Sequence, residues 1–172
     1  MQAKRFLGLS AAVSGMALAI ATFAPAASAA TATENLGVSA TVANNCTIST
    51  SAVAFGAYDP VGAHASANLD GTGTVTVACT KGASATIGLG LGANASGSTR
   101  RMTDGSSNYL TYELYQDAGR TTVWSDSGSG LLSPAAAPSV AARNFTVYGR
   151  VASSQDVPAG TYSDTVVATV NF

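Results

Sequence analysis

Short segments in which apolar and polar residues alternate with a period of two limit most strongly what this 172-residue chain can fold into. Successive side chains of a β-strand point to opposite faces, so each segment covers a core with one face and meets solvent with the other. Stretches rich in Gly, Ser and Pro separate them, as in turns and loops. The alternating segments are 36–42, 73–80, 85–92, 109–116, 144–151 and 165–172, with weaker patterns at 52–58 and 122–124. We therefore predict one all-β domain, a sandwich or barrel, with little helix.

The first 29 residues have the parts of a secretory signal peptide. Lys4 and Arg5 form a basic start, an apolar run follows, and Ala27-Ser28-Ala29 fits the small-residue rule for cleavage. A membrane anchor is the alternative, but the run is rich in Ala and leads directly into the cleavage pattern. The sequence thus predicts that residues 1–29 are removed and that the mature chain is exported.

The charge of the mature chain bears on its partners. Removing Lys4 and Arg5 leaves six of the eight basic residues against nine acidic ones, a net charge of −3. This argues against nucleic acid and anionic membrane surfaces as partners. Only 10% of the full chain is charged, and a surface so poor in charge suits a protein that is packed into an assembly.

The two cysteines, Cys46 and Cys79, form an even pair in a chain that carries an export signal. Such a pair indicates a disulfide, which would stabilise the fold by roughly 3–4 kcal/mol on the chain-entropy model. Two free buried thiols are the alternative.

The sequence offers little for catalysis. His64 is the only histidine, and neither a Gly-x-Ser-x-Gly elbow nor a phosphate-binding loop occurs. A hydrolase built on His64 with a Ser and an Asp is the alternative to a surface histidine in a Gly/Ala-rich loop. No His/Cys/Asp cluster has the spacing of a metal site. We predict a protein that is not an enzyme, with no cofactor, metal or small-molecule substrate.

Two other groups of residues invite a binding function. Arg100 and Arg101 lie in a predicted loop over 92–108, where a solvated loop tip is the simpler interpretation. Aromatic side chains on strands more often pack than bind, although they could also form a carbohydrate platform. These are Trp124 and the tyrosines at 109, 112, 115 and 148.

A strand pattern without an obvious partner lies near the beginning of the chain, and a second strand pattern runs up to its last residue. Residues 30–44 precede the first cysteine, and their apolar side chains share one face: Leu36, Val38, Ala40 and Val42. Residues 165–172 end the chain with a second such face: Val166, Ala168, Val170 and Phe172. The pattern thus predicts an unused strand at the front of the chain and an uncovered edge at its end.

A series of motifs resembles the spore coat protein U domain family, which includes the pilin subunits of archaic, Csu-type chaperone–usher pili. The resemblance runs from about Ala32 to Phe172 and rests on "NCTIS" (45–49), "FGAYDP" (55–60), "GTVTVACTKG" (73–82), "RRMTDGSSNYLTYELYQDAGRTTVW" (100–124), "YGRV" (148–151) and "PAGTYSDTVVATVNF" (158–172). Ala168 stands where the ending of the family usually has a larger apolar residue.

The resemblance implies an incomplete immunoglobulin-like β-sandwich that lacks its last strand, completed by a donor strand from a neighbouring subunit. Residues 30–44 would be the donor extension and 45–172 the sandwich. Leu36, Val38, Ala40 and Val42 would then enter a groove whose edge includes Val166, Ala168, Val170 and Phe172. Implied partners are identical or related pilin subunits, a periplasmic chaperone and an outer-membrane usher. The implied route leads through the periplasm to the cell surface.

Three functions remain open. The first is a structural pilus subunit, serving adhesion or biofilm formation. The second is a secreted spore-coat or matrix protein of the same family. The third is a carbohydrate-binding adhesin module; a tip adhesin would carry a receptor domain before the sandwich, whereas only about 15 mature residues precede Cys46 here.

Overall fold

The computed structural model describes residues 27–172, so the predicted signal peptide lies outside the described residues except for its last three. Contacts divide the chain after Ser39 into an N-terminal unit and a body, Ala40–Phe172. In the N-terminal unit, residues 27–39 are exposed and contain neither helix nor strand. Among the described residues, none of the helices has the length and hydropathy needed to cross a bilayer.

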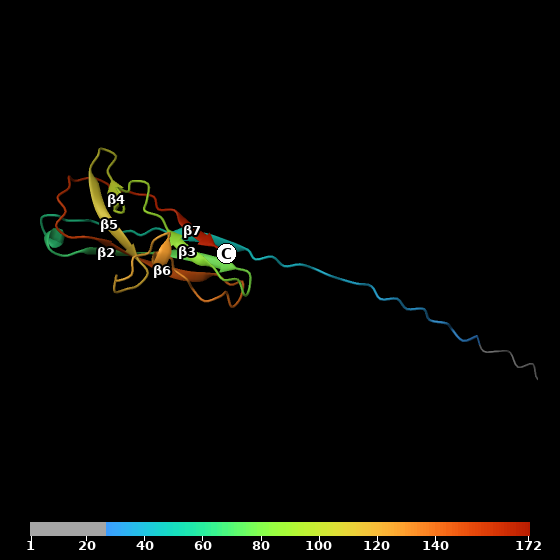
Figure 1. Ribbon diagram of the computed structural model, residues 1–172. Helices are drawn as coiled ribbons and strands as arrows, with labels where there is room; N and C mark the ends of the chain where they lie inside the picture. The colour runs from blue at the N-terminus through green and yellow to red at the C-terminus, as the bar shows by residue number, and fades with distance from the viewer. Residues whose placement is uncertain (1–26) are drawn as a thin grey trace, which may run out of the picture. The chain divides into compact units, whose positions relative to one another are not determined.

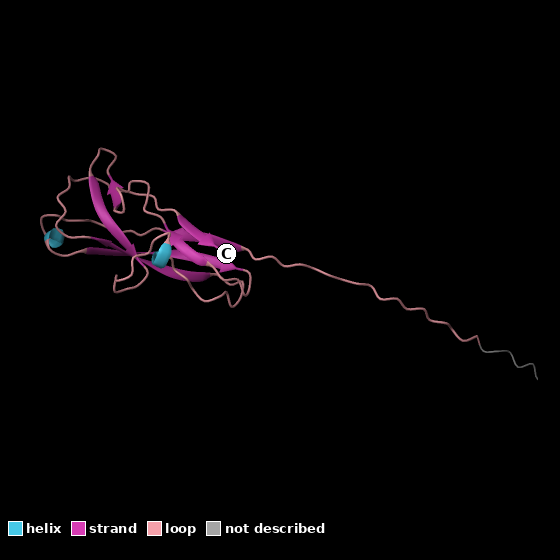
Figure 2. Cartoon of the chain, viewed as in Figure 1, coloured by secondary structure: helices cyan, strands magenta, loops and turns pink. Residues whose placement is uncertain are grey.

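The regular secondary structure of the body is almost entirely antiparallel strands, joined by long loops (Figures 1 and 2). One sheet has the order β1-β2-β6-β5-β4, and β3 and β7 form a second. The prediction of an all-β fold is confirmed; the described residues hold only two single-turn 3-10 helices, Ala63–Ala65 and Gly128–Gly130. The strands are β1 (Cys46–Ser51), β2 (Leu69–Cys79), β3 (Thr86–Leu89), β4 (Arg100–Thr103), β5 (Tyr109–Tyr115), β6 (Arg143–Val151) and β7 (Ala168–Asn171).

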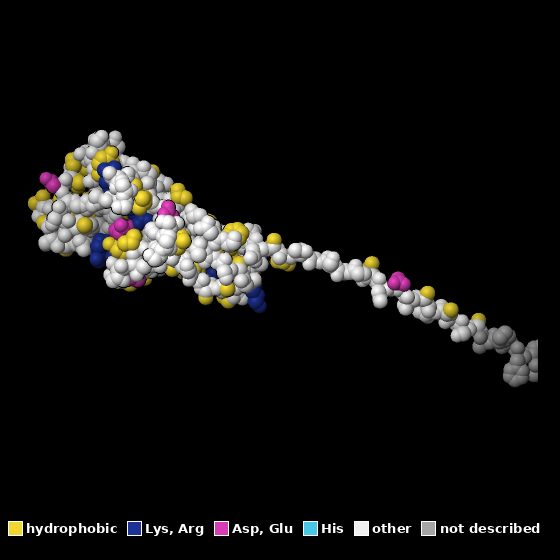
Figure 3. Space-filling model, viewed as in Figure 1, with side chains coloured by type: hydrophobic (Ala, Val, Ile, Leu, Met, Phe, Trp, Pro, Cys, Tyr) yellow, Lys and Arg dark blue, Asp and Glu magenta, His cyan; other side chains and the backbone are white. Residues whose placement is uncertain are grey.

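The core lies between the inner faces of the two sheets. Along β2 the alternation predicted from the sequence holds: Val75 and Val77 are 1% exposed, while Thr74 and Thr76 face outward. From the second sheet, Ile87 is fully buried. The outer face is mostly polar but uncharged (Figure 3), because Ser and Thr occupy its outward positions.

Four predicted segments differ from the structure. Residues 36–42 form no strand, and Leu36 and Val38 are each 88% exposed, since nothing in the described chain pairs with them. Residues 52–58 are also unpaired, and 122–124 contribute one isolated bridge, from Val123 to Tyr115. The predicted loop 92–108 contains β4, which pairs with β5.

Cys46 and Cys79 are joined by a disulfide, as predicted. They face each other in the register of β1 and β2, so the bond ties the first residue of the edge strand to the last residue of its neighbour.

Arg100 is not a loop tip. Its side chain is 1% exposed, and its guanidinium donates to the carbonyl oxygens of Gly90 and Trp124 at 2.8–3.0 Å. It also pairs with Glu113. Arg100 therefore ties β4 and β5 to the chain that follows β3 and to the segment around Trp124.

Candidate strand-docking groove

One wall of the candidate site is the extended segment that follows β1. Its side chains alternate, and Val53 and Phe55 turn inward onto β2 and β6. They fit because glycines face them: a Cβ on Gly149 would lie 2.7 Å from side-chain atoms of both Val53 and Phe55, and one on Gly73 would lie 2.7 Å from Val53. The glycines thus form a hollow in the sheet that seats this wall.

The opposite wall is residues 163–171. On one side this segment is fully engaged: Ser163 exchanges two hydrogen bonds with Thr103, the Val167 carbonyl accepts from Gly90, and β7 pairs with β3. Residues along an extended chain direct their backbone groups alternately to either side. Residues 164, 166, 168 and 170 therefore direct their N–H and C=O groups away from β3.

Neither wall has a backbone partner on the side that faces the other. Within residues 27–172, no backbone–backbone hydrogen bond reaches residues 52–57 or the free side of 164–170. Unpaired backbone edges favour the addition of a strand, and here two such edges flank one gap.

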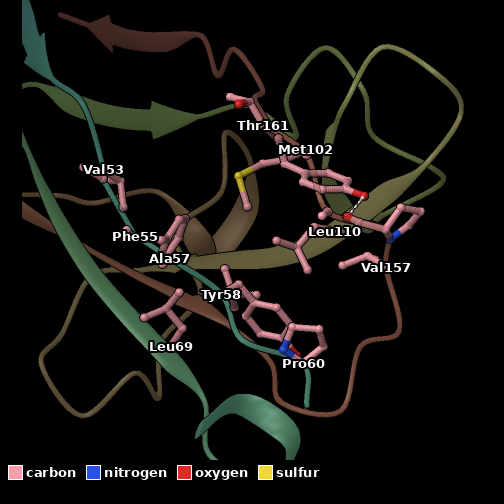
Figure 4. A pocket seen from close by; sticks show the side chains of 17 residues that line it. Val53, Phe55, Ala57, Tyr58, Pro60, Leu69, Met102, Leu110, Val157 and Thr161 are labelled. Atoms are coloured by element: carbon pink, nitrogen blue, oxygen red, sulfur yellow. Dashed lines mark hydrogen bonds between the residues drawn. The ribbon is translucent and has the colours of Figure 1, made fainter. Parts of the chain in front are cut away.

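The gap between the walls is hollow, and most of the side chains that line it are apolar. It comprises two cavities of about 300 and 570 Å³, both lined by Val53, Phe55, Met102 and Tyr162. Figure 4 shows Phe55, Met102 and Leu110 pointing into the larger cavity from different elements. We call the two cavities and their walls, residues 50–60 and 157–171, the groove.

The residues predicted for the groove edge are distributed along its second wall. Val166 and Ala168 are half-buried and line the smaller cavity. Val170 is half-buried beyond it and pairs with Ile87, and Phe172 is 55% exposed. Val167, on the other face of the same segment, is 68% exposed, so the predicted alternation of 165–172 is present.

The predicted donor residues lie outside any sheet in the single chain. Leu36 and Val38 are 88% exposed and Val42 is 82% exposed, and Ala40 is exposed as well. Large apolar side chains exposed to this degree in succession favour burial against another surface.

Asp164 is the carboxylate that lines the smaller cavity, and the protein satisfies it internally. Asp164 accepts hydrogen bonds from the Tyr112 hydroxyl at 2.7 Å and from the Asn94 side-chain amide at 2.9 Å. Burial, together with the neighbouring Asp164, raises the pKa of Tyr112 well above its usual value, so the hydroxyl remains a donor. The Asp164 carboxylate and the Tyr112 hydroxyl are therefore already hydrogen-bonded to each other, which suits an apolar occupant of the groove.

Other candidates from the sequence have structural roles. Trp124 is fully buried and donates its indole N–H to the Ile87 carbonyl at 2.9 Å, so it belongs to the core and not to a carbohydrate platform. His64 Nδ1 accepts the Asp59 backbone N–H at 2.8 Å, and its ring stacks on Tyr58. The described residues contain no group of His, Cys, Asp and Glu side chains that could hold a metal.

Sequence reasoning missed the groove residues Val53, Phe55, Met102 and Tyr162. The alternation at 53 and 55 was visible, but the signal that fixes their depth is the set of inward-facing glycines on β2 and β6. These glycines become meaningful only once β2 and β6 are known to be neighbours.

Comparison with protein families agrees with this architecture. The model of the Spore Coat Protein U domain matches residues 32–169. This chain belongs to that family. It is 44% identical over 170 residues to Protein U of Myxococcus xanthus, covering 91% of this chain and 93% of that protein. The family is structural, which agrees with the prediction that the chain is not an enzyme.

The fold is similar to that of a chain in the CsuC–CsuE complex, a chaperone–tip adhesion subunit pre-assembly complex from the archaic chaperone–usher Csu pili of Acinetobacter baumannii. The TM-score is 0.57 at 21% identity, and the match covers 77% of this chain and 41% of that one. The likeness is one of fold, and with the all-β architecture it identifies an incomplete immunoglobulin-like sandwich.

Proposed function

We propose that this protein is a structural subunit of a secreted surface fibre that polymerises by donor-strand complementation. Residues 30–44 of one molecule enter the groove of the next. The observation that carries the proposal is the groove itself: two extended walls, each with a free backbone edge, flank an apolar gap. A strand placed there can form hydrogen bonds on both sides.

The donor segment has the pattern that such a groove requires. Leu36, Val38, Ala40 and Val42 recur every second residue, so in an extended chain they project from one face about 6.6–6.8 Å apart. Burying each large side chain is worth roughly 1.5–3 kcal/mol, and Ala40 contributes less. Gly37, Ser39 and Thr41 face the other way, toward solvent.

The topology also suggests which way the donor runs. β2 ends at the disulfide, so its antiparallel neighbour β1 starts there and runs away from it. The next strand in the chain, β3, also starts at that end and runs away from it, and its antiparallel neighbour β7 therefore runs toward it. We call this end, with residues 43–46, 79–82 and Arg143, the root. The opposite end, with residues 59–66, 104–108 and 153–160, is the crown.

The orientation decides between a fibre and a closed dimer. A donor antiparallel to residues 163–171 finishes at the crown, so the root of its own body meets the crown of the acceptor, and the contact repeats without closing. A donor parallel to these residues would finish at the root, and two molecules could exchange donors reciprocally. We therefore assign the antiparallel orientation to the fibre.

Export, a periplasmic chaperone and an outer-membrane usher belong to this proposal. The similar fold comes from a complex with a chaperone, which supports a pilus, with adhesion or biofilm formation as its role. The second candidate, a spore-coat or matrix protein that assembles without an usher, is favoured by the relation to Protein U.

Electron microscopy of the exported protein would test the proposal. Val38→Asp with Val42→Asp should abolish fibres, because two carboxylates would enter an apolar groove. Ser39→Asp with Thr41→Asp adds the same charge to the opposite face and should leave fibres intact. Fibres from the first variant would refute donor-strand assembly, and export with and without chaperone and usher genes would separate pilus from coat.

A further inference from the structure

The chain between donor and body is short and anchored. Four peptide steps join Val42 to Cys46, which span about 13–14 Å when fully extended. The Thr80 hydroxyl receives the Asn45 N–H at 3.1 Å and donates toward the Ala43 carbonyl at 3.3 Å, and the Thr80 N–H donates to the Asn45 carbonyl at 2.9 Å. The donor is thus tied to the root up to residue 43. If Val42 occupies the crown end of an acceptor groove, the two bodies must touch.

The root carries unpaired positive charge. Lys81 lies two residues after Cys79 and is exposed, and Arg143 begins β6. Arg143 donates to the Ala135 carbonyl at 2.7 Å, but no ion pair involves Lys81 or Arg143 within residues 27–172.

The crown carries unpaired negative charge. Asp59 lies between Tyr58 and Pro60, and Asp156 precedes Val157; these three neighbours line the larger cavity. The Asp104 side chain lies beside Gly160, which lines the same cavity. Hydrogen bonds from the backbone of its own turn lower the pKa of Asp59, and hydrogen bonds led by the Asn108 side chain lower that of Asp104.

These charges are not offset within the body. No ion pair involves Asp59, Asp104 or Asp156 in the described chain, and Arg150, at the crown end of β6, is already engaged by Asp70. Figure 3 shows Asp or Glu at the tip of one end of the body and Lys or Arg at the tip of the other, with further charged side chains of both signs between them. The crown of one molecule is therefore complementary to the root of a second copy.

We propose a second contact between successive subunits, in which the acidic crown, Asp59, Asp104 and Asp156, faces the basic root, Lys81 and Arg143, of the incoming subunit. The inference rests on the proposed function, since donor insertion brings these ends together. Exposed ion pairs add little affinity, but complementary charges steer encounter and suppress wrong orientations. The contact would thus act on the rate and direction of assembly more than on the final stability.

Charge reversal in the mature chain, residues 30–172, tests the contact, with assembly after refolding followed by light scattering at 20 and 500 mM salt. Lys81→Glu and Asp156→Lys change exposed side chains for which no hydrogen bond occurs in the described structure. Each should slow assembly about tenfold at low salt and much less at high salt. The double variant Lys81→Glu/Asp156→Lys restores opposite charges and should recover most of the rate. Asp126→Lys, on an exposed loop beside β3, is the matched control and should assemble like the wild type.

A synthetic peptide of residues 30–44 separates the two proposals. The peptide has a donor but no root, so in excess it should block assembly of the wild type and of Lys81→Glu at the same concentration. If the peptide blocks both and the charge variants assemble at wild-type rates, the crown–root contact is refuted and the groove stands. If the peptide blocks neither, the donor-strand function itself fails.

Discussion

Moving the donor to the other end of the chain should turn a polymerising protein into a stable monomer. The variant begins at Asn45, and residues 30–44 follow Phe172 through a Gly/Ser linker. An antiparallel donor starts at the root, where β7 also ends, so a linker of two to five residues, as in a β-hairpin, is long enough. Because the linker gives an effective concentration in the millimolar range, insertion within the molecule should win over insertion between molecules.

The size of the effect follows from the side chains that enter the groove. In this rearranged chain, Val38→Asp with Val42→Asp removes two buried valines, worth roughly 3–6 kcal/mol together, before the cost of burying the carboxylates is added. For a domain of this size, 1 kcal/mol shifts the melting temperature by about 3–5 °C. We therefore expect the melting temperature to fall by at least 10 °C.

Thermal melting by circular dichroism and size-exclusion chromatography would measure both properties. Ser39→Asp with Thr41→Asp should stay within about 0.5 kcal/mol of the unmodified rearranged chain, because these positions face solvent. Equal losses from both pairs would mean that the donor register is wrong. A rearranged chain no more stable than residues 45–172 alone would refute the groove.

Three further results are expected. Replacing Cys46 and Cys79 by Ser should lower the free energy of unfolding by about 3–4 kcal/mol in urea titrations, since the bond closes a loop of 33 residues; two alkylatable thiols in the native wild-type protein would contradict the bond itself. Arg100→Met should lower the free energy of unfolding by about 3–5 kcal/mol in the same titrations, because it leaves buried carbonyl oxygens without a donor and Glu113 without its partner. A loss below 1 kcal/mol would contradict the role of Arg100 in holding these segments together. The hydrogen bond from Arg150 lowers the pKa of Asp70, so this pair stabilises the fold above about pH 4, the usual pKa of Asp, and that contribution is lost as pH falls through the lowered pKa. Between pH 5 and 2 the urea midpoint of Asp70→Asn should therefore fall less than that of the wild type. An equal fall in both proteins would show that Asp70 contributes nothing.

The elements that could be predicted from the sequence are those in which local pattern and tertiary packing agree. Residues 73–80 and 109–116 alternate and become β2 and β5, because each has a buried face and a partner on at least one side. The disulfide was predictable since both cysteines follow an export signal. The family motifs implied a groove edge at 165–172 by resemblance, and that role stays a prediction.

Elsewhere the outcome depended on neighbours distant in sequence. Residues 36–42 have a strand pattern but no partner strand in the described chain, so they remain unpaired. Arg100 stood in a polar, Gly/Ser-rich stretch, and only the carbonyl oxygens of Leu89, Gly90 and Trp124 explain its burial. The depth of Phe55 depends on Gly71 and Gly149, which belong to different strands.

The position of the disulfide has a mechanical consequence. In a fibre of the proposed kind, tension enters each body through residues 40–45 and reaches Cys46, the first residue of the edge strand β1. Without a cross-link, that pull would act along β1 and be carried in shear by its hydrogen bonds to β2 alone. The bond to Cys79 passes the load directly to β2, which is paired on both sides, by β1 and β6. Rupture would then require β2 to shear away from β6, over a longer register than that of β1 and β2, and reduction of this one bond should weaken a stretched fibre far more than a fibre at rest.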